Sequence, residues 1–262
     1  MNKPTSENLP DKNFNDYATR LKNTIYGSLK GKIRLKILLN DLDQFLKDNT
    51  PPLQILDAGC GLAQCALALA QKGHRLTLCD ISSAMIKESS QEFARQGIRH
   101  ARFLNESVQT HALNHQAYYD VILCHAVIEW TENPQELLAG FKRMLKPGGY
   151  LSLMFFNRTG TIFKSVLRGN FFEKDAGFKF GRTSTLTPTN PLDSAAVLGW
   201  LHDLDLTVVK KSGVRIFYDY CESSIRDQLD EKQVLNCELS FSQSEPYMSL
   251  ARYIHVLCKA RL

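Results

Sequence analysis

The sequence predicts an α/β protein with a mostly parallel seven-stranded sheet and helices on both faces. Between residues 51 and 157, five short apolar runs alternate with segments whose apolar residues recur at helical spacing. This alternation is typical of parallel strands joined by crossover helices. The chain has 262 residues, of which 44% are hydrophobic, and this is enough for one large core.

The elements before residue 157 follow from the apolar runs and from the residues that bound them. Gly73 and Gly97 each end a helical pattern as a C-terminal cap does, Ser82 or Ser83 can cap a helix start, and Pro134 begins another helix. We expect strands at residues 54–57, 75–81, 101–104, 120–124 and 150–156, and helices at residues 33–46, 63–72, 83–96 and 134–145.

Residues 157–191 interrupt this pattern. They show no periodicity and are rich in glycine, phenylalanine, threonine and basic residues, and the segment is too long for an idle connection. We interpret it as an insertion that covers the functional site. After it, we expect a helix at 192–204, a strand-like segment at 207–220, a mostly helical segment at 222–239 and a final strand at 248–259.

Composition excludes several classes of protein. No run of about 18 apolar residues appears, and the N-terminus lacks the pattern of a signal segment, so we expect no membrane span and a cytoplasmic location. The seven cysteines are scattered without the spacing of zinc or redox sites. We therefore expect reduced core cysteines and no metal.

The net charge of +5 is concentrated in two stretches. The first has no acidic residue and the second has only Glu173 and Asp175. Such clusters are typical of a protein that binds a polyanion, although solvated basic faces often look the same. Their basic residues are Arg20, Lys22, Lys30, Lys32, Arg34 and Lys36, and then Arg158, Lys164, Arg168, Lys174, Lys179 and Arg182.

A glycine turn follows the first expected strand. Residues 57–61, with the sequence DAGCG, would bring the backbone close to a ligand at the carboxyl edge of the sheet. Asp80 ends the second strand, where a carboxylate can accept hydrogen bonds from both ribose hydroxyls. A nicotinamide dinucleotide normally needs a third glycine, but Gln64 occupies that position. S-adenosylmethionine has no phosphate, so it fits this loop better.

These residues resemble the class I S-adenosylmethionine-dependent methyltransferases, whose fold is Rossmann-like. The resemblance rests on residues 56–61, Asp80, the fourth strand and the run LKPGG at residues 145–149. In this family the element after the third strand holds the adenine. The resemblance therefore implies that role for Ser107, Val108 and Gln109.

Nearly the whole chain also resembles the bacterial tRNA 5-carboxymethoxyuridine methyltransferases, which esterify a modified wobble uridine. The matching stretches are residues 23–27, 30–31, 124–130, 151–155, 213–217, 245–247 and 251–256. The resemblance implies S-adenosyl-L-methionine as the cofactor, with Arg34 suited to its carboxylate. The cofactor-binding residues that it implies are Arg34, Gly59, Cys60, Gly61, Asp80, Val108, Gln109 and His125.

The implied reaction needs positioning more than activation. A carboxylate is already ionised at neutral pH, so the enzyme must align its oxygen with the sulfonium methyl group and exclude water. The basic clusters would contact phosphates of the anticodon stem-loop of tRNA, and aromatic residues would stack on unpaired bases. The positioning candidates are Tyr26, Arg215, Tyr218, Arg252 and Tyr253, and the stacking candidates are Phe171, Phe172, Phe178 and Phe180.

Two alternative functions remain open on the sequence alone. The same domain could methylate a small carboxylic acid or a quinone precursor, with the insertion acting only as a lid. The chain could instead be a non-catalytic RNA-binding module that keeps a degenerate nucleotide fold, although Gly59, Gly61 and Asp80 together argue against this.

The same reasoning divides the chain into four parts. Residues 1–50 form an N-terminal helical segment over the cofactor site, and residues 51–157 form the cofactor-binding core. Residues 158–191 are the basic and aromatic insertion, which acts as a lid or an RNA contact. Residues 192–262 complete the catalytic domain, with a helical insertion near 222–239.

Overall fold

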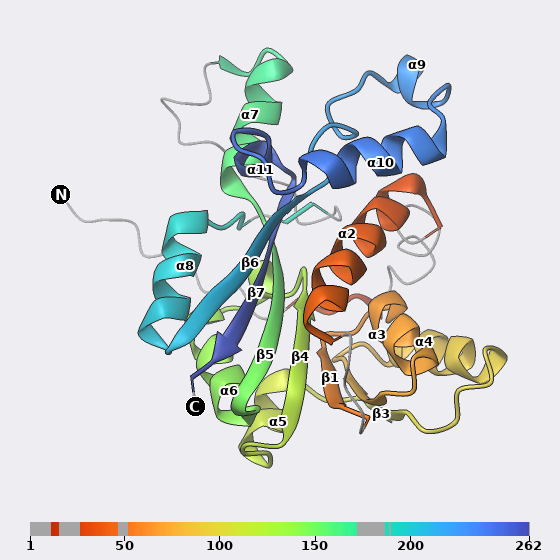
Figure 1. The fold of residues 1–262 in the computed structure, drawn as a ribbon, viewed down its shortest axis with the longest axis vertical. Helices are drawn as coiled ribbons and strands as arrows, with labels where there is room; N and C mark the ends of the chain where they lie inside the picture. The colour runs from red at the N-terminus through yellow and green to blue at the C-terminus, as the bar shows by residue number, and fades with distance from the viewer. Residues whose placement is uncertain (1–11, 16–26, 47–51, 172–186, 189, 262) are drawn as a thin grey trace.

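A computed structural model describes residues 12–15, 27–46, 52–171, 187–188 and 190–261. Seven strands form one sheet in the order β3-β2-β1-β4-β5-β7-β6 (Figure 1). All pairs among β1 to β5 are parallel, and β7 runs antiparallel to both β5 and β6. The predicted mostly parallel seven-stranded sheet is confirmed. The strands are β1 (Gln54–Ala58), β2 (Arg75–Cys79), β3 (Arg102–Leu104), β4 (Tyr119–His125), β5 (Leu145–Phe156), β6 (Leu206–Val214) and β7 (Tyr253–Ala260).

Helices cover both faces of the sheet, as predicted. On one face lie α2 (Leu29–Leu46), α3 (Gln64–Gln71) and α4 (Ser83–Arg95), and on the other α5 (Val108–Leu113), α6 (Pro134–Met144) and α8 (Ser194–Asp203). Adjacent residues of one strand pack on opposite faces: Ile55 belongs to the core under α2 and α3, and Leu56 belongs to the core under α6 and α8. The remaining helical elements are the 3₁₀ helix η3 (Ile128–Trp130), α7 (Arg158–Leu167), α9 (Ser223–Arg226), α10 (Glu231–Phe241) and α11 (Tyr247–Leu250).

The start of the predicted insertion is a helix, so the prediction that residues 158–167 lack periodic structure is wrong. Asn157 begins α7, because its side-chain oxygen accepts a hydrogen bond from the N–H of Thr159 at 3.1 Å. Its Nδ2 donates to the carbonyls of Ser249 and Ala251 at 2.9 and 2.8 Å. Tertiary contacts of one asparagine, rather than an apolar stripe, therefore fix where this helix begins.

Several predicted bounds in the second half are also wrong. β6 ends at Val214 and not at residue 220, because Arg215 has φ of 64° and leaves the extended region. The final strand begins at Tyr253 and not at residue 248, because α11 occupies the residues before it. The helical segment predicted at 222–239 is two helices, and the side chain of Asp230 caps the second by accepting from the N–H of Gln233 at 2.8 Å.

β5 is longer than predicted. It begins at Leu145, where we expected the preceding helix to end, and Leu145 pairs with Tyr119 before the register shifts. Gly148 lies at that irregularity with φ of 75°. The run at residues 145–149 therefore turns the chain from α6 into the sheet at the amino end of β5.

Candidate functional site

A cavity lies at the carboxyl edge of the sheet, where β1, β2 and β4 end. Loops that follow these strands supply most of its lining, and α2 reaches it with one side chain. Of the eight predicted cofactor residues, only Cys60 does not line it: its side chain is buried and lines a smaller cavity next to the first. The other seven predicted cofactor residues line the cavity, namely Arg34, Gly59, Gly61, Asp80, Val108, Gln109 and His125.

The glycine turn is fixed by backbone hydrogen bonds and by its close packing. The N–H groups of Gly59 and Cys60 both donate to the carbonyl of Cys79, at 2.9 and 3.0 Å. Gly59 has φ of +69°, and a Cβ atom there would lie 2.6 Å from Cγ2 of Val127. A left-handed backbone and this close approach together require glycine at the position.

The carboxylate of Asp80 is held in place by the backbone around it. Oδ2 accepts from the N–H of Gly61 at 2.9 Å, and Oδ1 accepts from the N–H of Ser82 at 2.8 Å. Burial raises the pKa of Asp80, while these two hydrogen bonds oppose the rise. An ionised carboxylate has about four lone-pair sites, so about two remain for the hydroxyl groups of a ligand.

Arg34 lies against the end of β4. Its Nη2 donates to the carbonyl of His125 at 3.0 Å. Asp57 is buried nearby, and burial raises its pKa to about 7 while the charge of Arg34 opposes the rise. Burial, together with the charges of His255 and Arg34, holds the pKa of His125 well below its ordinary value. The imidazole ring of His125 is therefore neutral at pH 7.

An aromatic wall, part of which the sequence analysis missed, completes the cavity. Phe14 meets Trp130 edge to face with ring centroids 5.1 Å apart, and Nζ of Lys12 lies 4.6 Å from the Trp130 centroid. Nδ2 of Asn13 donates to the carbonyl of Ile81 at 3.1 Å, which ties this N-terminal stretch to the loop after β2. The wall also contains the apolar side chains of Met85 and Leu137.

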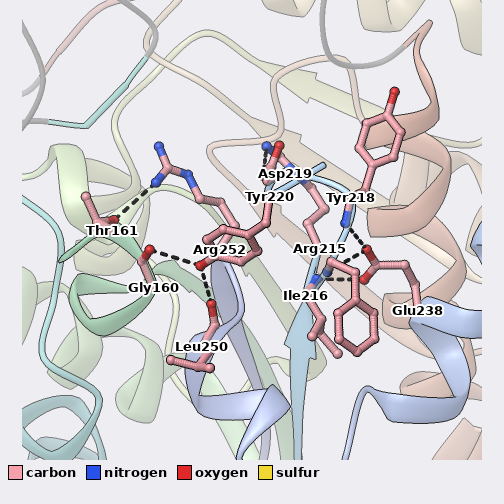
Figure 2. Close-up of polar contacts among 11 residues, drawn as sticks. Gly160, Thr161, Arg215, Ile216, Tyr218, Asp219, Tyr220, Glu238, Leu250 and Arg252 are labelled. Carbon is pink, nitrogen blue, oxygen red and sulfur yellow. Dashed lines mark hydrogen bonds and ion pairs between the residues drawn. The ribbon is translucent and has the colours of Figure 1, made fainter. Parts of the chain in front are cut away.

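A buried ion pair between Arg215 and Asp219 lies beside the cavity (Figure 2). Burial raises the pKa of Asp219, but Arg215 and the nearby cations Lys164 and Arg252 outweigh this effect and lower it. The guanidinium of Arg215 also lies 5.5 Å from the ring centroid of Tyr253, which lines the cavity. Tyr253 therefore joins the cofactor cavity to a cluster of cations.

Arg252 belongs to this cluster and, within the described residues, forms no ion pair of its own. Its Nη1 donates to Oγ1 of Thr161 at 3.4 Å (Figure 2). Its guanidinium lies 4.4 Å from the ring centroid of Phe156. Burial lowers the pKa of Arg252, but a guanidinium remains charged at neutral pH. Arg252 is a half-buried cation that can accept an anionic partner.

The turn after β6 is held by a carboxylate that the sequence analysis did not predict. Both oxygens of Glu238 accept backbone hydrogen bonds, from the N–H groups of Ile216 at 2.6 Å, Phe217 at 3.0 Å and Tyr218 at 2.8 Å (Figure 2). This places Tyr218 on the same turn as Arg215. Of the five positioning candidates, Arg215, Arg252 and Tyr253 lie together, and Tyr26 lies outside the described residues.

Comparison with known proteins adds the family. Residues 56–151 match a family model described as a methyltransferase domain. Over 253 residues the chain is 37% identical to the tRNA 5-carboxymethoxyuridine methyltransferase of Escherichia coli (strain K12), a match that covers 96% of this chain and 97% of that protein. The chain belongs to the tRNA 5-carboxymethoxyuridine methyltransferase family. This confirms the resemblance on which the sequence analysis relied.

Other relatives match a smaller part of the chain. A ubiquinone biosynthesis O-methyltransferase of Klebsiella pneumoniae is 26% identical over 161 residues, which are 62% of this chain and 63% of that protein. Among solved structures, the magnesium protoporphyrin IX methyltransferase from Synechocystis PCC 6803, determined with bound SAH, has a TM-score of 0.64 at 16% identity and covers 94% of this chain and 96% of that one. These neighbours confirm the predicted Rossmann-like class I methyltransferase fold.

We searched the described residues for a membrane-spanning helix and for a metal site. Within the described ranges, no helix is both long and apolar enough to span a bilayer. The described residues also contain no group of three or more histidine, cysteine, aspartate or glutamate side chains placed to hold a metal ion.

Proposed function

We propose that this protein transfers the methyl group of S-adenosyl-L-methionine to the carboxylate of 5-carboxymethoxyuridine at the wobble position of tRNA, which forms the methyl ester. The observation that carries the proposal is the half-buried cation Arg252, which lies beside the cofactor cavity of a member of this family and forms no ion pair within the described residues. Such a cation suits a carboxylate substrate, because it forms charge-assisted hydrogen bonds with it.

The cavity fits S-adenosyl-L-methionine better than a dinucleotide. The loop N–H groups of Gly59 and Cys60 already donate to the carbonyl of Cys79, and that of Gly61 donates to Asp80, so none of them is available for a pyrophosphate. Asp80 can accept hydrogen bonds from the ribose hydroxyls, and Arg34 can hold the carboxylate of the cofactor. The aromatic and apolar wall suits the adenine, with Val108 and Gln109 on the same cavity.

The bound cofactor supplies an electrophilic methyl group on a sulfonium sulfur. The new bond joins that methyl carbon to a carboxylate oxygen, and the electrons of the broken carbon–sulfur bond stay on sulfur, so no proton is moved and no base is needed. The protein must instead hold the carboxylate in line. Asp219 already balances the charge of Arg215, and we assign the carboxylate of the substrate to Arg252, which forms no ion pair within the described residues.

A basic crevice next to the cation cluster provides a place for the RNA backbone. It lies between α7 and residues 219–226, and its cationic lining residues are Lys164, Arg168 and Arg226. Its acidic lining residues are Asp219, which is paired with Arg215, and Glu222. Burial lowers the pKa of Lys164 to about 8, so a phosphate at the crevice would favour the charged lysine. We assign this crevice to phosphates of the anticodon stem-loop beside the modified uridine, and such a substrate implies a cytoplasmic site of action.

The experiment compares substrates and Arg252 variants. Labelled S-adenosyl-L-methionine is supplied with tRNA from cells that lack this protein, or with a mixture of small carboxylic acids. We expect transfer to tRNA alone. Arg252→Ala should lower kcat/KM by at least about tenfold through loss of the charged contact, and Arg252→Lys should restore part of it.

The matched control is Arg261→Ala, because Arg261 is an exposed arginine paired with Asp205 at the far end of β7. This substitution should leave kcat/KM unchanged. Efficient transfer to a small acid without RNA would reject the tRNA substrate, and full activity of Arg252→Ala would reject the proposed carboxylate contact.

A further inference from the structure

Four buried side chains form a continuous hydrogen-bonded row from α2 to the cofactor cavity. Oδ2 of Asp41 lies 2.7 Å from Nδ1 of His255, and Nε2 of His255 lies 2.8 Å from Oγ of Ser152. The same Oγ lies 2.8 Å from Nε2 of His125. Asp41, Ser152 and His255 are fully buried and His125 is 8% exposed, so water does not interrupt the row.

The balance of charges determines which group donates in each hydrogen bond of the row. Oδ1 of Asp41 lies 3.6 Å from Nζ of Lys210, so the carboxylate charge is already compensated and a charged His255 would leave a net positive charge in the core. Because a carboxylate only accepts, Nδ1 of the neutral His255 must donate to Asp41. The remaining nitrogen, Nε2, then accepts the hydroxyl proton of Ser152.

This direction determines which nitrogen of His125 carries its proton. The hydroxyl of Ser152 is used as a donor toward His255, so its oxygen can only accept from Nε2–H of His125. The ring is neutral, and Nδ1 is therefore left with a lone pair. Nδ1 makes no hydrogen bond in the described structure, and His125 lines the cofactor cavity.

We propose that Asp41, His255 and Ser152 act as positioning residues that hold His125 in the Nε2–H tautomer, so that its Nδ1 accepts a hydrogen bond from the α-ammonium group of the cofactor. This inference rests on the cofactor assigned under the proposed function. The ammonium and carboxylate groups of S-adenosyl-L-methionine share one carbon atom. Arg34, which is assigned to that carboxylate, hydrogen-bonds to His125 itself, so both groups of the cofactor meet the same residue pair.

The helix α2 is well placed to serve both contacts. Arg34 and Asp41 are seven residues, or about two turns, apart on α2, and they therefore lie on one face. One reaches the carbonyl of His125 directly, and the other reaches its imidazole through two further side chains. The row thus explains why polar residues interrupt the otherwise apolar strands β5 and β7 at Ser152 and His255.

The test measures ligand preference instead of turnover. Calorimetry compares S-adenosylhomocysteine with an analogue in which hydrogen replaces the α-amino group. Ser152→Ala should weaken binding of S-adenosylhomocysteine by about tenfold, which is the effect of one charge-assisted hydrogen bond, and should leave binding of the analogue unchanged. Ser152→Thr keeps the hydroxyl and should restore the preference.

The matched control is Ser212→Ala. Ser212 is also fully buried and lies opposite His255 on β6, and its hydroxyl has no hydrogen-bond partner in the part of the chain that the structure describes. Its substitution should leave the affinities for both ligands unchanged. If Ser152→Ala weakened both ligands equally, or neither, the positioning role would be overturned.

A second measurement does not depend on any variant. Nuclear magnetic resonance of ¹⁵N-labelled histidine in the unsubstituted protein reports which ring nitrogen carries the proton. We expect the proton of the His125 ring to be on Nε2, and a proton on Nδ1 would overturn the inference. If the unsubstituted protein failed to bind S-adenosylhomocysteine, the cofactor assignment itself would fall, and this inference with it.

Discussion

Glu129 follows the end of β4 on η3 and is almost fully buried. Burial raises its pKa from 4.5 to about 8. Between these values the folded protein holds a proton that the unfolded chain has released. The unfolding free energy contributed by this group is therefore fully present below about pH 4.5 and is lost as the pH rises to about 8.

Replacement of this carboxyl by an amide should flatten the pH dependence of stability. We expect Glu129→Gln to reduce the fall of the unfolding free energy by up to about 1 kcal/mol per pH unit between about pH 5 and pH 8. Urea unfolding at several pH values in this range measures the unfolding free energy. Glu136→Gln changes an exposed carboxyl of α6 and should leave the slope as it is. If the unfolding free energy changed equally with pH in the unsubstituted protein and in both variants, Glu129 would not hold a proton in the folded state.

At the residue scale, sequence patterns predict the cofactor residues that stand at strand ends. The glycine turn and Asp80 were recognised because each directly follows an apolar run, and the structure places them on one cavity. Phe14 gives only a weak signal, one aromatic residue in a polar leader. Glu238 gives none, because a glutamate on a helix is ordinary until the fold brings the turn after β6 against it.

At the element scale, α7 depends on close backbone contact. A Cβ atom on Gly160 would lie 2.7 Å from the carbonyl oxygen of Leu250 and would meet that of Ala251 still more closely. The hydroxyl of Tyr220 lies within hydrogen-bond distance of the carbonyls of Gly160 and Leu250, at 3.0 and 2.6 Å (Figure 2). This contact joins α7, the segment after β6 and the residues before β7, and it holds Thr161 near Arg252.

Gly160→Ala should therefore separate these segments. We expect a loss of about 1–3 kcal/mol in the free energy of unfolding, because backbone atoms must move to admit the methyl group. Gly199→Ala is the control, since Gly199 lies on α8 and no atom of the described residues comes within 4 Å of the added Cβ. There the loss should be absent, and alanine should stabilise the helix by about 0.5–1 kcal/mol. Urea unfolding compares the two, and equal effects would contradict the contact.

The five strands of the first half and most of its helices were predicted because each carries its own period, but α5 was missed because its six residues are too few to show one. The segments after residue 157 were predicted less well, because their limits depend on tertiary contacts. Asn157 at the start of α7 donates to carbonyls that come more than 90 residues later, and Glu238 on α10 holds the turn after β6 by accepting hydrogen bonds from its backbone N–H groups. Such distant partners leave no pattern in the local sequence.

At the scale of the whole molecule, the charge distribution predicts salt-dependent RNA binding. Each phosphate contact releases counterions, so the affinity for tRNA should fall as salt rises, with a logarithmic slope of about 0.7 for each contact to single-stranded RNA. The double substitution of Lys164→Gln and Arg168→Gln removes two cations of the crevice. It should lower this slope by about 1 to 1.5.

The control for the crevice is Lys72→Gln, because Lys72 is already paired with Asp43 on the surface of the cofactor-binding core. Its slope should match that of the unsubstituted protein. Filter binding at several salt concentrations measures all three proteins. If the double variant and the control behaved alike, the crevice between α7 and residues 219–226 would not be the phosphate site.

The most direct measurement is mass analysis of nucleosides from tRNA that has been incubated with this protein and S-adenosyl-L-methionine, with and without mild alkali. The account predicts that 5-carboxymethoxyuridine becomes heavier by one methylene unit and that alkali reverses the change, because only an ester is cleaved under those conditions. A methyl group that survives alkali, or one on any other nucleoside, would contradict carboxylate methylation by this site.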